Sequence, residues 1–190
     1  DRITSLASSF RTGQAIKQGI PVAIIGKTNV GKSTLLNRLV GEEKAIVSDI
    51  HGTTRDIIED TIDIHGVTFR FVDTAGLRTT DDVIEQIGIE RSYSALSKAA
   101  IVLWVIDTPP SEEELSDITS RCKGKQVIAV INKTDKFPAT PLSTSGQSLS
   151  IPFSTLSISA LNGTGINELT DTIYAKSGIP EIGENDAIIT

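Results

Sequence analysis

Residues 20–33 read IPVAIIGKTNVGKS, and this stretch decides the fold. The apolar, β-branched run up to Gly26 is typical of a buried parallel strand. The remainder matches G-x-x-x-x-G-K-[ST], whose glycines let successive backbone N–H groups point at an anion. Residues 32–40 have helical spacing, so a helix dipole adds to the anion site. The stretch therefore predicts a phosphate-binding loop, with Lys32 on the terminal phosphates and Ser33 on Mg²⁺.

Strand-like and helix-like segments alternate along the rest of the chain. We expect strands at 57–64, 67–72, 101–106, 127–131 and 153–158, and helices at 2–18, 84–98, 111–121 and 165–175. His65-Gly66 joins the first two strands as a hairpin. Residues 41–56 and 136–150 are expected to be loops, and 178–190 a tail. This order predicts a three-layer α/β fold with a mostly parallel sheet and one antiparallel hairpin strand, whose ligands sit beyond the carboxyl ends of the strands.

Composition bounds the class of protein. The chain has 190 residues, 38% hydrophobic and 22% charged, which suits one globular domain. Its net charge of −6 disfavours nucleic-acid binding through bulk charge. The single Cys122 excludes an intramolecular disulfide. No apolar run approaches the ~18 residues of a membrane span. The chain begins at Asp1 and lacks methionine, so we expect a fragment or processed product. No signal-peptide pattern is present, so we expect a cytoplasmic location without membrane contact.

A second chemical motif, Asp73-Thr74-Ala75-Gly76, follows the hairpin. A carboxylate at this strand end can hold Mg²⁺ through water, and the N–H of Gly76 can contact a γ-phosphate. The next residue is Leu77, where Ras-like enzymes have a glutamine that orients the attacking water. Since leucine has no side-chain hydrogen bond to offer, either hydrolysis is slow or another group positions the water.

A third motif, Asn132-Lys133-Thr134-Asp135, follows the strand at 127–131 and fits Asn-Lys-x-Asp. A carboxylate can accept both the ring N–H and the exocyclic amine of guanine, and sites of this kind discriminate by ~10⁴ or more. The aliphatic stem of Lys133 can cover the base, and Asn132 can brace the loops. After the last strand, residues 159–161 can place a backbone N–H near the guanine carbonyl oxygen.

Taken together, these ordered motifs resemble the translation-factor class of P-loop GTPases. Three further features narrow the resemblance: Asn29 in the phosphate loop, GTTRD at 52–56, and DTAGLR at 73–78 followed by EQIGIERS at 85–92. With them the chain resembles the G domains of the MnmE (TrmE) family of tRNA-modification GTPases, among the TrmE-Era-EngA-like proteins. The resemblance implies a Ras-like G domain that binds GTP or GDP with Mg²⁺ and K⁺.

The resemblance also implies residue roles. It assigns GTP binding to Asn29, Val30, Gly31, Lys32, Ser33, Thr34, Ser48, Thr53, Thr54, Asp73, Thr74, Ala75, Gly76, Asn132, Lys133, Asp135, Ser159, Ala160 and Leu161. Catalytic roles go to Glu85, Lys32, Thr54 and Gly76, with Glu85 orienting water through a second water. Mg²⁺ ligands are Ser33, Thr54 and, through water, Asp73; K⁺ ligands are the Asn29 side chain and carbonyls around Ser48, Ile50 and Thr53.

For the whole protein, the resemblance implies that G domains dimerise transiently and that GTP hydrolysis drives tRNA wobble-uridine modification with the flavoprotein MnmG. It divides the chain into a helical segment at 1–18 from a flanking helical domain, a G domain at 19–182, and a linker at 183–190 back to that helical domain. Two alternatives stay open: an RNA-binding ribosome-assembly GTPase of the Era or EngA type, and a slow GTP switch that needs an external activator.

Several other residues have plainer interpretations. His51 and His65 are expected in turns, and Trp104 in the core. The acidic run 112–114 is expected at a helix N-terminus, where it complements the dipole. Arg55 and Arg78 are expected to be surface residues.

Overall fold

The computed structural model describes residues 19–43, 60–72, 95–136 and 151–179. Six strands in these ranges form one sheet in the order β2-β3-β1-β4-β5-β6. The strands are β1 (Ile20–Ile25), β2 (Asp60–Ile64), β3 (Val67–Phe71), β4 (Ile101–Ile106), β5 (Gln126–Ile131) and β6 (Ser154–Ser157). The helices are α2 (Lys32–Glu43), α5 (Glu112–Arg121) and α6 (Ile166–Lys176). All neighbouring strands are parallel except β2 and β3, which confirms the predicted sheet.

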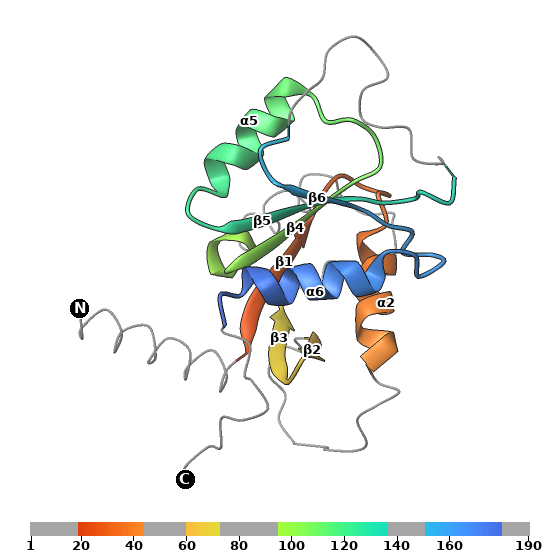
Figure 1. The fold of residues 1–190 in the computed structure, drawn as a ribbon. Coiled ribbons are helices and arrows are strands. Elements are labelled where there is room, and N and C mark those ends of the chain that lie inside the picture. Colours follow the sequence, from red (N-terminus) through yellow and green to blue (C-terminus); the bar gives the residue numbers. More distant parts are fainter. Residues whose placement is uncertain (1–18, 44–59, 73–94, 137–150, 180–190) are drawn as a thin grey trace, which may run out of the picture.

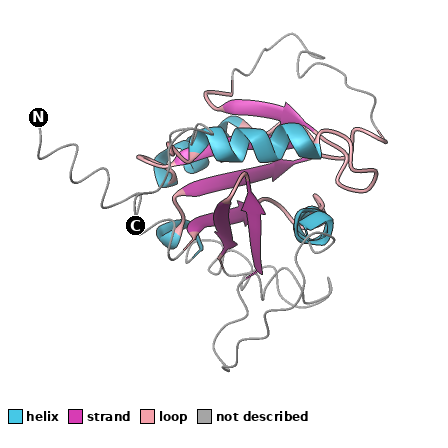
Figure 2. Cartoon of the chain, turned by 60° about the horizontal axis from the view of Figure 1, so that its bottom comes forward, coloured by secondary structure: helices cyan, strands magenta, loops and turns pink. Residues whose placement is uncertain are grey.

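Helices cover both faces of the sheet, giving three layers (Figures 1 and 2). Alternate residues of the central strands point to opposite faces, since strand side chains have a period of two. Val22 and Ile24 join the core beneath α2 and α6. Ala23 and Ile25 join a second core that includes Leu115 and Ile118 of α5 and the helical residues 95–98. Burial of both faces explains why β1 and β4 read as continuous apolar runs.

The hairpin between β2 and β3 forms as its sequence predicts. Ile64 pairs with Val67, so His65-Gly66 is a two-residue turn. Both turn residues have positive φ, 54° for His65 and 78° for Gly66, as a type I′ turn requires. His65 also reaches Asp171 of α6, with Nε2 to Oδ1 at 2.9 Å.

Strand register brings the functional edge together. Ile25 of β1 lies beside Trp104 of β4, and Ile106 of β4 lies beside Ile131 of β5. Ile131 in turn lies beside Ser157 of β6. The carboxyl ends of four parallel strands are therefore nearly level, and the loops that leave them meet at one edge of the sheet.

Some predicted boundaries were wrong. The helix predicted to end at residue 40 continues to Glu43, because Gly41 does not take the left-handed conformation by which a glycine ends a helix and only lowers helix propensity. Ile179, inside the predicted tail 178–190, instead packs against the main core. The last strand is shorter, at 154–157. Helix 2–18, strand residues 57–59, most of helix 84–98, the loop residues 44–56 and 137–150, and segment 183–190 lie outside the described residues.

The plainer predictions inside the described ranges are confirmed. Trp104 is 3% exposed and meets the ring of Phe153 edge-on. The acidic run 112–114 opens α5, which Ser111 caps. Cys122 is a free, buried thiol. Among the residues that the structure describes, no helix is long and apolar enough to cross a membrane.

Candidate nucleotide-binding site

The phosphate loop runs from the end of β1 to the start of α2, and two glycines give it its shape. At Gly26, with φ 147°, an added Cβ would come 2.2 Å from the carbonyl oxygen of Val105. At Gly31, with φ 98°, it would come 2.3 Å from the side-chain nitrogen of Asn132. Real side chains do not fit at such distances, so glycine allows the loop to pack against β4 and against the loop after β5.

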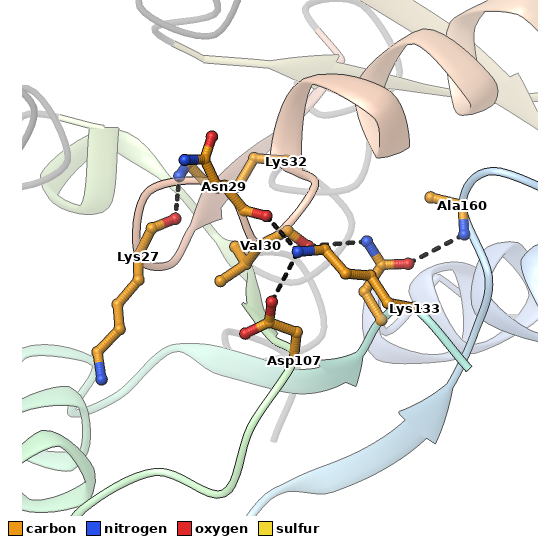
Figure 3. Close-up of polar contacts among 8 residues, drawn as sticks. Lys27, Asn29, Val30, Lys32, Asp107, Lys133 and Ala160 are labelled. Carbon is orange, nitrogen blue, oxygen red and sulfur yellow. Dashed lines mark hydrogen bonds and ion pairs between the residues drawn. The ribbon is translucent and has the colours of Figure 1, made fainter. Parts of the chain in front are cut away.

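The phosphate loop lies at the positive end of α2 and carries a lysine. The first turn of α2 contains no acidic residue, so nothing there offsets the positive end of the helix dipole. Lys32 folds back over the loop, and its Nζ donates to the carbonyl oxygen of Lys27 at 2.6 Å (Figure 3). Asn29, which is exposed, adopts a left-handed conformation with φ 62°. These features make an anion-binding loop of the strand–loop–helix kind.

Asn132 ties three segments together. Its Nδ2 donates to the carbonyl oxygen of Val30 at 2.9 Å, and its Oδ1 accepts from the backbone N–H of Ala160 at 3.0 Å (Figure 3). The residue is only 5% exposed. The predicted bracing role is confirmed, and it joins the phosphate loop to the loop after β6. Because the N–H of Ala160 donates to Asn132, it is already occupied within the protein.

Lys133 crosses from the loop after β5 to the phosphate loop. Its backbone has φ 68°, and its Nζ contacts both the carbonyl oxygen of Asn29 and Oδ2 of Asp107, the latter at 2.7 Å (Figure 3). Both side chains of the ion pair are about one-quarter exposed, at 27% and 24%. Asp107 was missed by sequence reasoning, although its place directly after β4, at the carboxyl edge, is the signal that could have identified it.

Ser159 orients the acidic residue of the third motif. It is 1% exposed, and its hydroxyl donates to Oδ1 of Asp135 at 2.6 Å. The same hydroxyl accepts from the backbone N–H of Asn162 at 3.2 Å. A carboxylate has further lone pairs after one such bond, so Asp135 is fixed in direction while it keeps acceptor capacity for a ligand. Sequence reasoning had placed Ser159 in the site only as part of a backbone loop.

A second residue missed from the sequence is Arg38 of α2. Its Nε donates to the carbonyl oxygen of Ala160 at 3.1 Å, and its Nη2 donates to the carbonyl oxygen of Leu161. The helix that follows the phosphate loop therefore holds the loop that follows β6.

The capping box of α5 contacts the phosphate loop from the other side. Glu114 accepts from the backbone N–H of Ser111 at 3.0 Å and pairs with Nζ of Lys27 at 2.8 Å. Burial alone would raise the pKa of Glu114, but the hydrogen bonds from Lys27 and Ser111 outweigh it and hold the pKa below its usual range. The pair is modest in energy because the Lys27 side chain is 65% exposed.

Much of the predicted set cannot be compared with the structure. Outside the described residues lie Ser48, Ile50, Thr53, Thr54, Asp73, Thr74, Ala75, Gly76 and Glu85. Of the predicted Mg²⁺ ligands, Ser33 is described, exposed on the first turn of α2. Within ranges 19–43, 60–72, 95–136 and 151–179, no three His, Cys, Asp or Glu side chains gather as a metal site.

This sheet order, with a phosphate loop after β1 and an Asn-Lys-x-Asp loop after β5, defines a P-loop GTPase domain. The model of the family described as 50S ribosome-binding GTPase matches residues 21–133, more than half of the chain. The chain belongs to this family.

Individual relatives agree with that class. The chain is 51% identical to a protein of Phocaeicola vulgatus named tRNA modification GTPase MnmE, over 99% of this chain and 39% of that protein. It is 47% identical to the protein of the same name from Bacteroides fragilis, over 99% and 42%. The crystal structure of the G domain of the T. maritima iron transporter FeoB shares the fold, with TM-score 0.56 and 22% identity over 83% of this chain and 98% of that one. The chain spans about two-fifths of the length of these curated relatives.

Proposed function

We propose that the carboxyl edge of the sheet binds a guanine nucleotide, with phosphates in the loop at 26–33 and the base between loops 132–135 and 159–161. The observation that carries this proposal is the double hydrogen bond of Asn132, which links the phosphate loop to the loop after β6. Asp135, aimed by Ser159, supplies the acceptors that guanine needs and adenine cannot satisfy.

Hydrolysis needs groups on both sides of the phosphate loop. In our proposal Lys32 neutralises charge on the β- and γ-phosphates, and the N–H of Gly76 contacts the γ-phosphate. Glu85 orients the attacking water through a second water, which replaces the glutamine absent at Leu77. Asp73 and Thr54 complete the metal site at Ser33.

Two of the described residues, Ser33 and Asn29, have the chemistry that sites for Mg²⁺ and K⁺ need. Mg²⁺ keeps several waters and takes few protein ligands, and Ser33, an exposed residue at the start of α2, would supply its hydroxyl as one of them. For K⁺, the exposed amide of Asn29 offers an oxygen on a loop whose backbone Lys133 holds. With carbonyls at Ser48, Ile50 and Thr53, Asn29 would hold a cation that offsets charge developing on the transferred phosphate.

For the whole protein, we infer a role in tRNA modification. Support comes from the 51% and 47% identity, over nearly all of this chain, to proteins named tRNA modification GTPase MnmE. In this proposal GTP drives transient pairing of two G domains, and the motion serves wobble-uridine modification on tRNA with the flavoprotein MnmG. Those contacts belong to the full-length protein, of which this chain supplies the GTPase domain.

The test is GTP hydrolysis at high protein concentration, first in potassium and then in sodium at equal ionic strength. Potassium alone should give fast turnover, and Asn29→Ala should abolish the difference. Asn167→Ala, which changes an exposed asparagine of α6, is the matched control and should keep it. Equal slow rates in both salts would overturn the cation mechanism in favour of a switch that needs an external activator. In a competition assay with labelled GDP, ADP should displace the label far less well than unlabelled GDP. Equal displacement by the two nucleotides would overturn the proposed guanine site.

A further inference from the structure

The guanidinium of Arg38 bridges α2 to two successive carbonyl groups. Nε donates to Ala160 and Nη2 to Leu161, across 122 and 123 positions of sequence. Figure 1 shows α2 beside the end of α6 where this loop enters. A planar fork with several fixed donors suits paired acceptors, and charge-assisted hydrogen bonds of this kind are stronger than neutral ones. Arg38 therefore constrains the direction of two consecutive peptide planes.

The neighbouring backbone N–H groups, those of residues 159, 160, 162 and 163, all donate within the protein. The N–H of Ala160 donates to Asn132, and the N–H of Asn162 donates to the hydroxyl of Ser159. The N–H of Gly163 donates to the carbonyl oxygen of Ser159. In the part of the chain that the structure describes, the N–H of Leu161 makes no hydrogen bond, and Leu161 is 61% exposed. Among the backbone N–H groups of residues 159–163, it is thus the one that these contacts leave for a ligand.

Peptide geometry connects these two observations. A trans peptide unit is planar, with its C=O and N–H pointing in opposite directions. The carbonyl of Ala160 and the N–H of Leu161 belong to the same unit. By holding that carbonyl toward α2, Arg38 turns the N–H of Leu161 to the opposite side of the loop.

We propose that Arg38 is a positioning residue for base recognition, which aims the N–H of Leu161 at the 6-oxygen of guanine. The inference rests on the proposed guanine site and adds a residue from the phosphate-side helix to it. Base recognition then has two parts. Asp135 accepts hydrogen bonds from the ring N–H and the 2-amino group, while the N–H of Leu161, positioned by Arg38, donates to the 6-oxygen.

The division can be tested with three nucleotides, each titrated calorimetrically into the chain with Mg²⁺. GDP carries all the groups. 6-Thioguanosine diphosphate replaces the 6-oxygen with sulfur, a weak acceptor. Inosine diphosphate keeps the 6-oxygen and lacks the 2-amino group. Arg38→Met removes the fork, Arg38→Lys leaves one donor group, and Arg121→Met is the matched control on α5, where Arg121 pairs with Asp117.

Arg38→Met should weaken GDP binding about tenfold, the value of one hydrogen bond, and leave 6-thioguanosine diphosphate nearly unchanged. Its preference for GDP over inosine diphosphate should persist. Arg38→Lys should fall between, and the control should match the unmodified chain. Circular dichroism establishes that each variant is folded, and Arg38→Lys carries the test if Arg38→Met is not.

The inference fails if Arg38→Met keeps the full preference for GDP over the thio analogue. It also fails if binding of all three nucleotides weakens equally, since that indicates a merely structural arginine. A failure of the guanine site itself looks different: the unmodified chain would then show no preference for GDP over inosine diphosphate.

Discussion

Replacing Asn132 with alanine should destabilise the domain even without nucleotide. The change removes the hydrogen bonds to the carbonyl of Val30 and the N–H of Ala160, at 2.9 and 3.0 Å. Because Asn132 is 5% exposed, both backbone groups lose their partners in a place nearly closed to water. An unsatisfied buried group costs about 1–3 kcal/mol. Water entering between the loops offsets part of this, so we expect a loss of about 2–4 kcal/mol in the free energy of unfolding.

That loss is large for a domain of this size. Total stabilities are about 5–15 kcal/mol, and 1 kcal/mol shifts Tm by about 2–4 °C at 150–250 residues. Asn132→Ala should therefore lower Tm by about 4–16 °C. Lost apolar burial cannot produce this effect, because the asparagine side chain contributes one methylene, as alanine contributes one methyl.

Urea unfolding followed by far-UV circular dichroism measures the change. The midpoint should fall while the slope stays constant, since the surface exposed on unfolding is the same. Asn167→Ala, an exposed control on α6, should change the free energy by less than about 0.5 kcal/mol. A similarly small change for Asn132→Ala would refute the reasoning, because the two hydrogen bonds would then contribute nothing to holding the loops.

Three further outcomes follow from the structure. Gly31→Ala should abolish GDP binding in a titration and lower Tm, since the new Cβ would lie 2.3 Å from the Asn132 nitrogen at φ 98°; unchanged binding would contradict the packing of this loop. Burial raises the pKa of Cys122, so a thiol reagent should modify the native chain at least about tenfold more slowly than the urea-unfolded chain. Despite its burial, hydrogen bonds from Lys27 and Ser111 lower the pKa of Glu114. The ionised Glu114 therefore stabilises the fold at pH values above its unfolded pKa, and this stabilisation is lost as pH falls through its folded pKa. The urea midpoint of the unmodified chain should therefore exceed that of Glu114→Gln near neutral pH, with the gap closing below about pH 4.3.

The sheet could be predicted because its signals are local. Strands β1 and β4 have the bounds expected from their apolar runs, and the His65-Gly66 turn forms where its residue types require it. Helix α2 runs past its expected end because Gly41 stays helical and does not take the left-handed conformation of a C-cap glycine. Short-range patterns thus predict which segments are strands or helices better than they predict where each element ends.

The site was predictable in its motifs and unpredictable in its contacts. The phosphate loop and the Asn-Lys-x-Asp loop stand out because spacing carries their chemistry. Asp107 does not, since it meets Lys133 across 26 positions and a lone aspartate after a strand is common. Arg38 acts across 122 positions, and a single arginine on a helix gives no sign of which carbonyl it will reach. Such contacts depend on the register of the sheet, which sequence patterns leave undetermined.

The loop after β5 also constrains the backbone of the phosphate loop. Lys133 holds the carbonyl of Asn29, and Asn132 holds the carbonyl of Val30. In trans peptides the following N–H groups, those of Val30 and Gly31, must point the opposite way. Two residues of the loop after β5 therefore set the direction of two N–H groups in the phosphate loop. Because the same contacts serve both ends, ordering of either loop by a bound nucleotide favours the geometry that the other requires.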